Sequence, residues 1–274
     1  MKSNSNKKWL ATPYVFWSVL FIIIPLCMII YYGLTDKTGA FTLENVIAIA
    51  SIGHARALWR SILLSLISTV LCFLLAYPLS MILANMKGGQ YGFIILIFIL
   101  PMWMNFLLRT LAWQTLLEKT GVINGILSFL GLPKLNIINS SYAIVLGMVY
   151  NFLPFMVLPL YNAIAKIDEN VINAAKDLGA NRVQTFFRII LPLSVPGIIS
   201  GVTMVFVPAL TTFVISTLLG GSKVLLIGNV IEQEFTQTGN WHLGSGLSIV
   251  LMIFILINMV VTAIFDKDGE GSAL

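Results

Sequence analysis

Side chains that could carry out chemistry are few in this sequence. Cys27 and Cys72 are the two cysteines, and both lie inside apolar runs, where their spacing fits neither a disulfide framework nor a metal site. His54 and His242 have no companion ligands nearby in the sequence, so we expect surface residues rather than metal ligands or catalytic groups. There is no nucleotide-binding glycine loop and no nucleophile beside a base. We therefore predict no enzymatic activity, no bound metal and no cofactor for this chain.

The composition indicates that most of the chain is surrounded by lipid. Apolar residues make up 58% of the sequence and charged residues only 10%, whereas soluble domains carry roughly 25% charged residues. The net charge is +5, but the basic residues are scattered singly between apolar runs. Because they form no patch, we interpret them as signals of membrane topology and not as a nucleic-acid site.

Six apolar segments are long enough to cross a bilayer as helices, because a membrane helix needs about 20 predominantly apolar residues. The chain is therefore predicted to be an all-α polytopic membrane protein with a single transmembrane domain over residues 1–274. The six spans run approximately from Pro13 to Leu34, Ser61 to Asn85, Tyr91 to Leu117, Ser141 to Ile164, Ile189 to Leu219 and Leu247 to Phe265.

The orientation follows from the lysines and arginines near the ends of the spans. Their count is higher on one side, and this side is predicted to be cytoplasmic and to hold both termini. The first apolar run, from Pro13 to Leu34, is longer than the apolar region of a signal peptide, so we expect an uncleaved first membrane helix.

The cytoplasmic connection 166–188 has the pattern of two short helices. Asp168 can cap the first, Gly179 can end it in the left-handed conformation, and Asn181 can cap the second. This pattern is more ordered than that of a simple linker. We therefore expect ordered structure here.

The first of these helices has an apolar face made by Val171, Ala174, Ala175 and Leu178. It is too short to be stable alone in water and too polar to cross a membrane, so it needs a surface to pack on. The two alanines would let it sink into a groove of a partner protein. The alternative is an amphipathic helix that lies on the membrane surface.

This connection resembles the "EAA" loop of binding-protein-dependent ABC importer permeases. The pattern of that loop is Glu-Ala-Ala, three residues, Gly, nine residues and Ile-x-Leu-Pro, and every position matches except Asn173, which replaces the glutamate. The resemblance implies a type I importer bundle whose loop couples to a cytoplasmic ATPase. The implied coupling residues are Asn173, Ala174, Ala175, Leu178, Gly179, Ile189, Leu191 and Pro192.

Three further stretches resemble the permeases of spermidine/putrescine-type importers. They run from Leu100 to Trp113, from Val149 to Tyr161 and from Phe206 to Val214. Relatives often have Gly-Asp where this chain has Thr211 and Thr212, so an acid that could hold a polyamine is missing here.

The resemblance implies that the chain forms a path for polyamines in a bacterial cytoplasmic membrane. Its expected partners are a second permease, two copies of an ATPase that uses ATP, and an extracytoplasmic binding protein. An importer of another solute, such as thiamine, iron or an organic phosphate, is the alternative. The coupling loop is shared across the family and does not indicate which solute is transported. A secondary carrier is less well supported, since every Asp and Glu falls in a loop or tail.

A polyamine path needs ring faces and hydrogen-bond acceptors. The residues that could supply them, or attract cations near the outer mouth, are Trp103, Asn105, Trp113, Asn229 and Glu232. For the tryptophans, a place in the interfacial aromatic belt is an equal alternative.

Arg109 is the one charge well inside a predicted span. Three interpretations stay open: a structural pair with a carboxylate of the second permease, which we favour, a side chain that reaches the outer interface, or a gate that repels cationic substrate.

Overall fold

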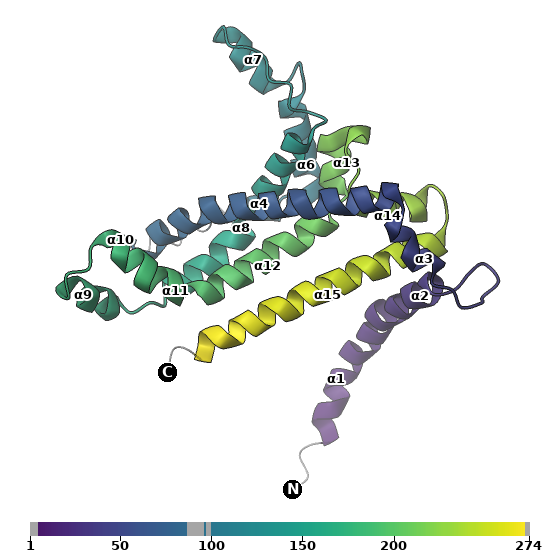
Figure 1. Cartoon of the computed structure of the whole chain (residues 1–274), viewed down its shortest axis with the longest axis horizontal. Helices are drawn as coiled ribbons and strands as arrows, with labels where there is room; N and C mark the ends of the chain where they lie inside the picture. Colours follow the sequence, from purple (N-terminus) through teal and green to yellow (C-terminus); the bar gives the residue numbers. More distant parts are fainter. Residues whose placement is uncertain (1–4, 87–95, 97–99, 272–274) are drawn as a thin grey trace. The chain divides into compact units, whose positions relative to one another are not determined.

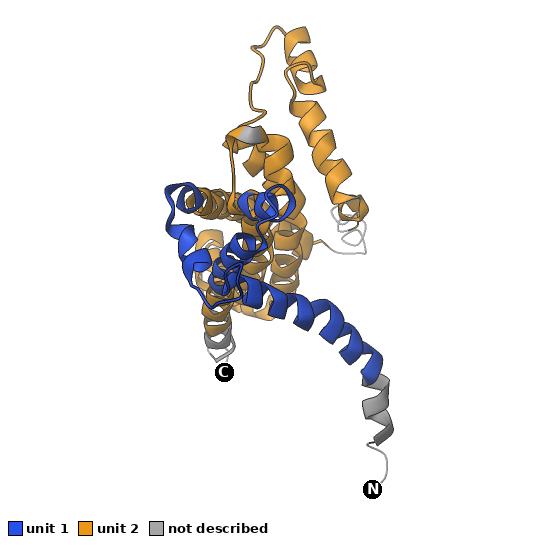
Figure 2. Ribbon diagram, turned by 90° about the vertical axis from the view of Figure 1, so that its right-hand side faces the viewer, with its two compact units in different colours: residues 1–56, 230–255 blue, residues 57–229, 256–274 orange. Residues whose placement is uncertain are grey.

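The computed structural model describes residues 5–86, 96 and 100–271, and the described residues form helices joined by loops (Figure 1). Among these residues, the β structure is limited to one isolated bridge between Thr35 and Phe41. The predicted all-α class is confirmed. The chain divides into two compact units, residues 1–56 with 230–255 and residues 57–229 with 256–274 (Figure 2).

The first unit begins with one long apolar helix built from three pieces. They are α1 (Ser5–Ser18), the π-helical turn η1 (Val19–Ile23) and α2 (Ile24–Gly33). The wide turn ends two residues before Pro25, which lacks the N–H that a regular α-helical turn would need. The unit continues with α3 (Glu44–Ile47) and η2 (Ala48–Ala50).

The end of α2 is fastened to the start of α15 (Trp241–Gly271) by hydrogen bonds to backbone carbonyls. The Nδ1 atom of His242 lies 2.7 Å from the carbonyl oxygen of Thr35 and 3.1 Å from that of Tyr32. The Nδ2 atom of Asn45 donates to the oxygen of Thr35 at 3.0 Å. These bonds give side-chain partners to backbone carbonyls at and just after the end of α2.

The second unit is centred on α4 (Ile52–Ala84, which starts in the first unit), α8 (Ser141–Ile164) and α12 (Val195–Thr211). Helices α8 and α12 run side by side in Figure 1. Glycines permit this approach, because a Cβ atom on Gly197 would lie 2.5 Å from the Cβ atom of Ala163, and one on Gly201 would lie 2.6 Å from the Sδ atom of Met156. Small residues at helix contacts are typical of membrane bundles.

Helix α4 presents buried hydroxyl groups to α8. The Ser80 hydroxyl donates to the carbonyl oxygen of Val157 at 3.1 Å, and the Ser68 hydroxyl lies 3.3 Å from the Sδ atom of Met148. Hydroxyl groups can replace apolar contacts between membrane helices because they add interhelical hydrogen bonds in a medium without water.

Four helices in the described part of the chain are long and apolar enough to cross a membrane. They are Thr12–Gly33, Ile52–Ala84, Ser141–Ile164 and Trp241–Ile264. A fifth results if the bent pair Arg182–Leu193 and Val195–Thr211 counts as one span. Six were expected.

The sixth expected span is the one predicted from Tyr91 to Leu117, which the structure describes only in part. Its residues 91–95 and 97–99 lie outside the described residues. The rest is divided into the 3-10 turn η3 (Leu100–Trp103) and α6 (Phe106–Leu117), because Asn105 caps a new helix.

The predicted span from Ile189 to Leu219 is also divided. The chain bends by 64° at Ser194 and leaves the helical conformation again at Thr212, before α13 (Val214–Gly220) and the 3-10 turn η5 (Gly221–Lys223).

Residues 220–246, which connect the last two predicted spans, belong partly to the core. Leu226 and Ile227 are fully buried, and the N–H of Ile227 donates to the Ser61 hydroxyl at 2.8 Å. The short helix α14 (Ile227–Thr236) starts at this buried point. Hydropathy alone assigns such a short apolar stretch to a loop, because it contains no information about the Ser61 hydroxyl, which accepts a hydrogen bond from the backbone of this stretch.

Candidate coupling loop

The connection between α8 and α12 folds as a helical hairpin with the predicted caps. Its helices are α9 (Glu169–Asp177) and α10 (Arg182–Thr185). The Asp168 carboxylate accepts the N–H of Asn170 at 2.9 Å, which confirms the first cap. Asn181 and Gln184 form a reciprocal capping box, with bonds of 2.8 and 2.9 Å.

Gly179 makes the turn between the two helices. Its φ of +84° lies in the left-handed region, as predicted, and the following N–H of Ala180 donates to the carbonyl oxygen of Ala175 at 3.0 Å. A side chain at this position would strain the backbone, so the glycine sets the angle at which α10 leaves α9.

The two alanines of the predicted apolar face have different surroundings. Ala175 is buried inside the hairpin, whereas Ala174 is exposed. The face is therefore divided: the Ala175 side chain is covered by this chain itself, and Ala174 is available to another molecule. Asn173 is also exposed, and its Oδ1 atom accepts a long bond of 3.5 Å from the Lys176 ammonium.

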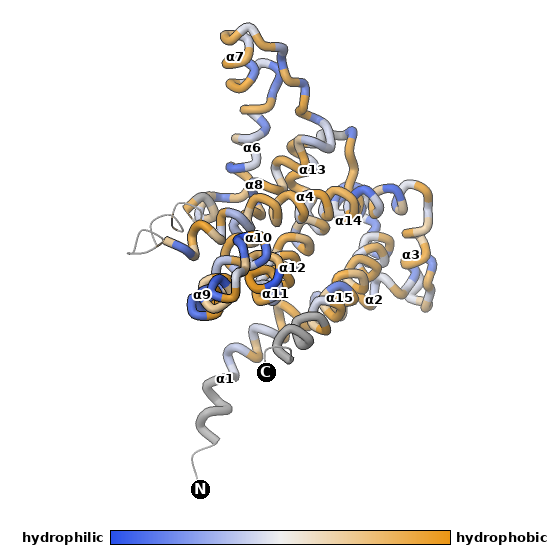
Figure 3. Tube along the Cα trace, turned by 60° about the vertical axis from the view of Figure 1, so that its left-hand side comes forward, coloured by the Kyte–Doolittle hydropathy of each residue, from blue (hydrophilic) through white to orange (hydrophobic). Residues whose placement is uncertain are grey.

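Large apolar side chains of the hairpin and the turn after it are exposed. Leu178 is 90% exposed, and Val183, Phe187 and Val171 are 64%, 59% and 45% exposed. Polar residues lie between them, so α9 alternates between hydrophilic and hydrophobic colours in Figure 3. Apolar groups gathered on a polar segment are typical of a surface that another protein covers.

Behind the hairpin, the chain enters the bundle through a sharp bend. The π-helical turn η4 (Phe186–Ile190) and α11 (Leu191–Leu193) lead to Ser194, which is fully buried. Of the predicted coupling residues here, Ile189 and Leu191 are half-buried and Pro192 is exposed.

Tyr77 of α4 connects to this bend. Its hydroxyl lies 2.7 Å from the Ser194 Oγ atom. The Ser194 hydroxyl donates to the carbonyl oxygen of Leu191 at 2.9 Å, so Tyr77 must be the donor in the first bond. The ring of Tyr77 also meets that of Phe186 edge to face, with 5.5 Å between centroids.

The sequence reasoning did not identify Tyr77. The signal that was available is a tyrosine in an otherwise apolar span, because a buried phenol needs a hydrogen-bond partner. That Ser194 is the hydrogen-bond partner of Tyr77 could not be predicted without the fold.

The residues predicted for a substrate path are used in different ways. Trp103 is 78% exposed. Asn105 caps α6, and its Oδ1 atom accepts the N–H groups of Leu107 and Leu108 at 2.9 and 3.2 Å. Trp113 packs edge to face against Tyr150, with centroids 5.1 Å apart.

Asn229 is buried and holds the chain between α12 and α14 together. Its Nδ2 atom donates to the carbonyl oxygen of Phe213 at 3.1 Å and to the Thr217 hydroxyl at 2.8 Å, and its Oδ1 atom accepts the N–H of Leu226 at 3.1 Å. These bonds give Asn229 a structural role in this conformation.

Glu232 belongs to the first unit, whereas the other four residues belong to the second. Its carboxylate accepts a bond of 2.9 Å from the Thr236 hydroxyl one helical turn later.

Arg109 is 7% exposed, and its guanidinium lies among aromatic rings. The Cζ atom is 5.9 Å from the ring centroid of Phe106 and 6.0 Å from that of Tyr150. Such contacts stabilise a cation away from water. Trp113 and Arg109 therefore share Tyr150 as a neighbour.

Comparison with known proteins gives matches along most of the chain. Residues 62–267 match the family model described as binding-protein-dependent transport system inner membrane component. The spermidine/putrescine transport system permease protein PotB of Haemophilus influenzae is 37% identical over 253 residues, which cover 89% of this chain and 88% of that protein. The PotB protein of Escherichia coli K12 is 38% identical, with 89% and 92% covered.

A solved structure shares the fold. The crystal structure of a bacterial ABC transporter involved in the import of the acidic polysaccharide alginate contains a chain that matches with a TM-score of 0.77 and 19% identity, and the match covers 96% of each chain.

Proposed function

The chain belongs to the family of binding-protein-dependent transport system inner membrane components, and we propose that it forms, with a second permease, the membrane path of an importer for polyamines such as spermidine and putrescine. Like its relatives, which are permease proteins of transport systems, it is a transport subunit and not an enzyme. The identity to two spermidine/putrescine permeases over nearly their whole length carries the substrate assignment. The shared family alone would leave the solute open.

The partners that we propose are two copies of a cytoplasmic ATPase, the second permease and an extracytoplasmic binding protein. Both chain termini and the hairpin α9–α10 then lie in the cytoplasm. The excess of lysine and arginine on that side supports this orientation.

We propose that the hairpin docks in a cleft of the ATPase. Leu178, Val183 and Phe187 provide apolar surface, and Ala174 allows close approach. The exposed amide of Asn173 can exchange hydrogen bonds with the ATPase, but it cannot form the ion pair that a glutamate would form. Hydrophobic burial therefore contributes most of the docking free energy in this system.

Movement of the docked hairpin would reach the bundle by two routes. One is the continuous chain from η4 through α11 into α12, and the other is the hydrogen bond from Tyr77 to Ser194, which reaches α4. Because α12 and all of α4 from Ala57 onward belong to the second unit, a displacement at the bend can move two bundle helices together. This provides a physical means for alternating access.

Within the path, we propose that aromatic faces rather than carboxylates of this chain contact the polyamine. Trp103 is exposed and Trp113 is partly exposed, so both can offer ring faces to a cation. Asn105 and Asn229 use their oxygens within the protein and contribute only if the path rearranges. The acids that neutralise the polyamine must then come from the second permease or the binding protein.

The experiment is uptake of labelled spermidine or putrescine into vesicles that contain the complete complex, with ATP inside and loaded binding protein outside. We expect uptake that stops when the ATPase carries a catalytically inactive site. Good uptake of thiamine, iron or an organic phosphate, with none of either polyamine, would refute the substrate assignment and keep the importer architecture.

A further inference from the structure

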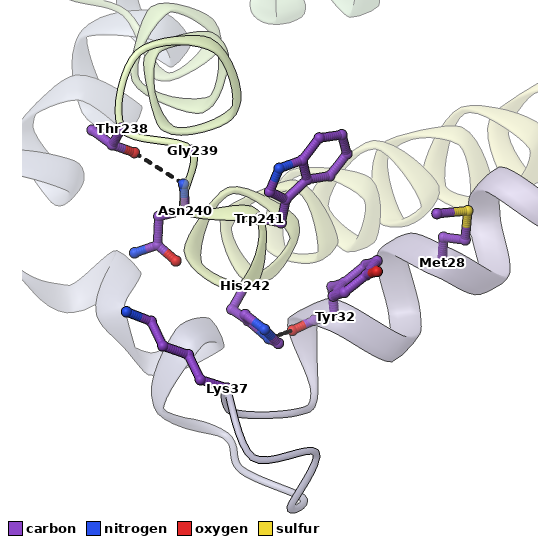
Figure 4. Close-up of a pocket in the computed structure, with 8 residues that line it drawn as sticks. All are labelled: Met28, Tyr32, Lys37, Thr238, Gly239, Asn240, Trp241 and His242. Carbon is purple, nitrogen blue, oxygen red and sulfur yellow. Dashed lines mark hydrogen bonds between the residues drawn. The ribbon is translucent and has the colours of Figure 1, made fainter.

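Two adjoining cavities lie within the first unit, where α2 ends and α15 begins. The first has a volume of about 310 Å³ and is lined by apolar side chains with one serine; the apolar residues are Pro25, Met28, Ile29, Tyr32, Phe235 and Trp241. The second, of about 660 Å³, adds the polar residues Lys37, Thr238, Asn240 and His242 (Figure 4). Met28, Tyr32 and Trp241 line both cavities, so a single elongated ligand could occupy them together.

The polar cavity is suited to an anion. Lys37 is the single charged residue of its lining, and Figure 4 shows its ammonium group on the side of Asn240. The Asn240 oxygen accepts the N–H of Leu243 at 3.3 Å, so the amide NH₂ is the group it can present to a ligand. An ammonium and an amide donor attract a phosphate and repel a polyamine.

His242 also lines this cavity. Its Nδ1 atom contacts two carbonyl oxygens, of Tyr32 and Thr35, and carbonyls only accept, so Nδ1 carries a proton. This bond holds the end of α2 against the start of α15, which makes the lining a formed site rather than a gap between loose segments.

The cavities lie where one candidate membrane helix ends and another begins. Both Thr12–Gly33 and Trp241–Ile264 are apolar helices long enough to cross a bilayer, and the cavities are located where they end. Tyr32 and Trp241 are the residue types that favour the headgroup region. Pro25 lies about 10 Å deeper along α2 than Tyr32, at 1.5 Å of rise per residue, so the apolar cavity extends toward the acyl chains.

We propose that these cavities bind one anionic phospholipid, with its phosphate beside Lys37 and Asn240 and part of an acyl chain between α2 and α15. The combination of an apolar groove with a cationic mouth at the end of two membrane helices selects a ligand with an anionic head and an apolar tail. The site does not depend on which solute is imported. Its occupant would keep the first long helix in place against α15.

The test is native mass spectrometry of the complete complex after reconstitution in nanodiscs of phosphatidylcholine with a minor share of phosphatidylglycerol. Two variants address the two ends of the site: Lys37→Glu reverses the charge at the mouth, and Met28→Trp fills the apolar groove. Lys134→Glu is the matched control, because it makes the same charge change at an exposed lysine of the other unit.

We expect one retained phosphatidylglycerol per copy of this chain, with retention about tenfold lower in each site variant and unchanged in the control. Equal loss in the control would mean that only general surface charge attracts the lipid, which would overturn the proposal. Inorganic phosphate at millimolar concentration is the second probe. If it binds with Lys37 dependence while Met28→Trp has no effect on lipid retention, the site recognises free phosphate and the lipid assignment is wrong.

Discussion

At the scale of single residues, the most informative contact is between the Tyr77 hydroxyl and Ser194. It joins a membrane helix to the point where the coupling loop bends by 64° into α12. A hydrogen bond buried in the bundle fixes a distance more strictly than apolar packing does, because it requires both length and angle. This bond therefore fixes the position of the end of the loop relative to α4.

We predict that Tyr77→Phe impairs coupling more than folding. The change leaves the ring contact with Phe186 in place and removes one hydrogen bond, so thermal stability of the complex should fall by the equivalent of about 1 kcal/mol. Spermidine imported per ATP hydrolysed should fall more strongly. Tyr142→Phe is the control, since Tyr142 is 81% exposed; an unchanged transport-to-hydrolysis ratio in Tyr77→Phe would show that the bond has no part in coupling.

At the scale of elements, the hairpin α9–α10 combines an internal face with an external one. Its caps and its left-handed glycine could be predicted from the sequence, because Asp168, Gly179 and Asn181 act on the backbone within a few residues. The division of the two alanines could not, because it depends on where α10 folds back. Periodicity places Ala174 and Ala175 on one face, and the hairpin buries only one of them.

This division predicts different outcomes for two neighbouring substitutions. Ala174→Trp should leave the permease folded but release the ATPase during purification, because the large indole would prevent the exposed face of α9 from entering the cleft of the ATPase. Ala175→Trp should first destabilise the hairpin, by about 1–3 kcal/mol for an overpacked site.

Hydrogen exchange of the isolated permease pair separates these two effects, with protection of α9 amides lost only in Ala175→Trp. Stable retention of the ATPase by Ala174→Trp would contradict the docking surface.

The turn between the helices gives a third prediction. Gly179→Ala forces a Cβ atom into the left-handed region and should destabilise the hairpin by about 1–2 kcal/mol. Gly131, which also has a positive φ but lies outside the loop, provides the control substitution Gly131→Ala. Retention of the ATPase should fall in the first variant only, and equal retention in both would mean that the geometry of this turn does not affect docking.

At the scale of the whole molecule, hydropathy predicts the membrane helices well where the chain runs straight. It fails where side chains interrupt a helix: Asn105 starts α6 inside one predicted span, and Ser194 bends another. It also places Asn229 in an outer loop, whereas this residue is tied by hydrogen bonds into the core. In each case a polar side chain forms a hydrogen bond with the backbone. The mean hydropathy of a segment carries no information about such a bond.

The close packing of α8 with α12 leads to a prediction about the bundle. Gly201→Leu should prevent the approach to Met156, lower the yield of folded complex and reduce thermal stability by at least the cost of overpacking, about 1–3 kcal/mol. Gly125→Leu is a suitable control, because a Cβ atom there meets no neighbour within 4 Å. Equal stability of the two variants would contradict this helix contact.

For the whole importer, we propose that this chain couples ATP hydrolysis by a cytoplasmic ATPase to the entry of polyamine from the other side of the membrane. The most direct measurement is the ATPase rate of the complete complex in nanodiscs, with empty and with spermidine-loaded binding protein. We expect that loaded binding protein raises the rate severalfold, and that Ala174→Trp abolishes the increase. Equal rates with empty and loaded binding protein, or stimulation only by a binding protein loaded with an unrelated solute, would contradict it.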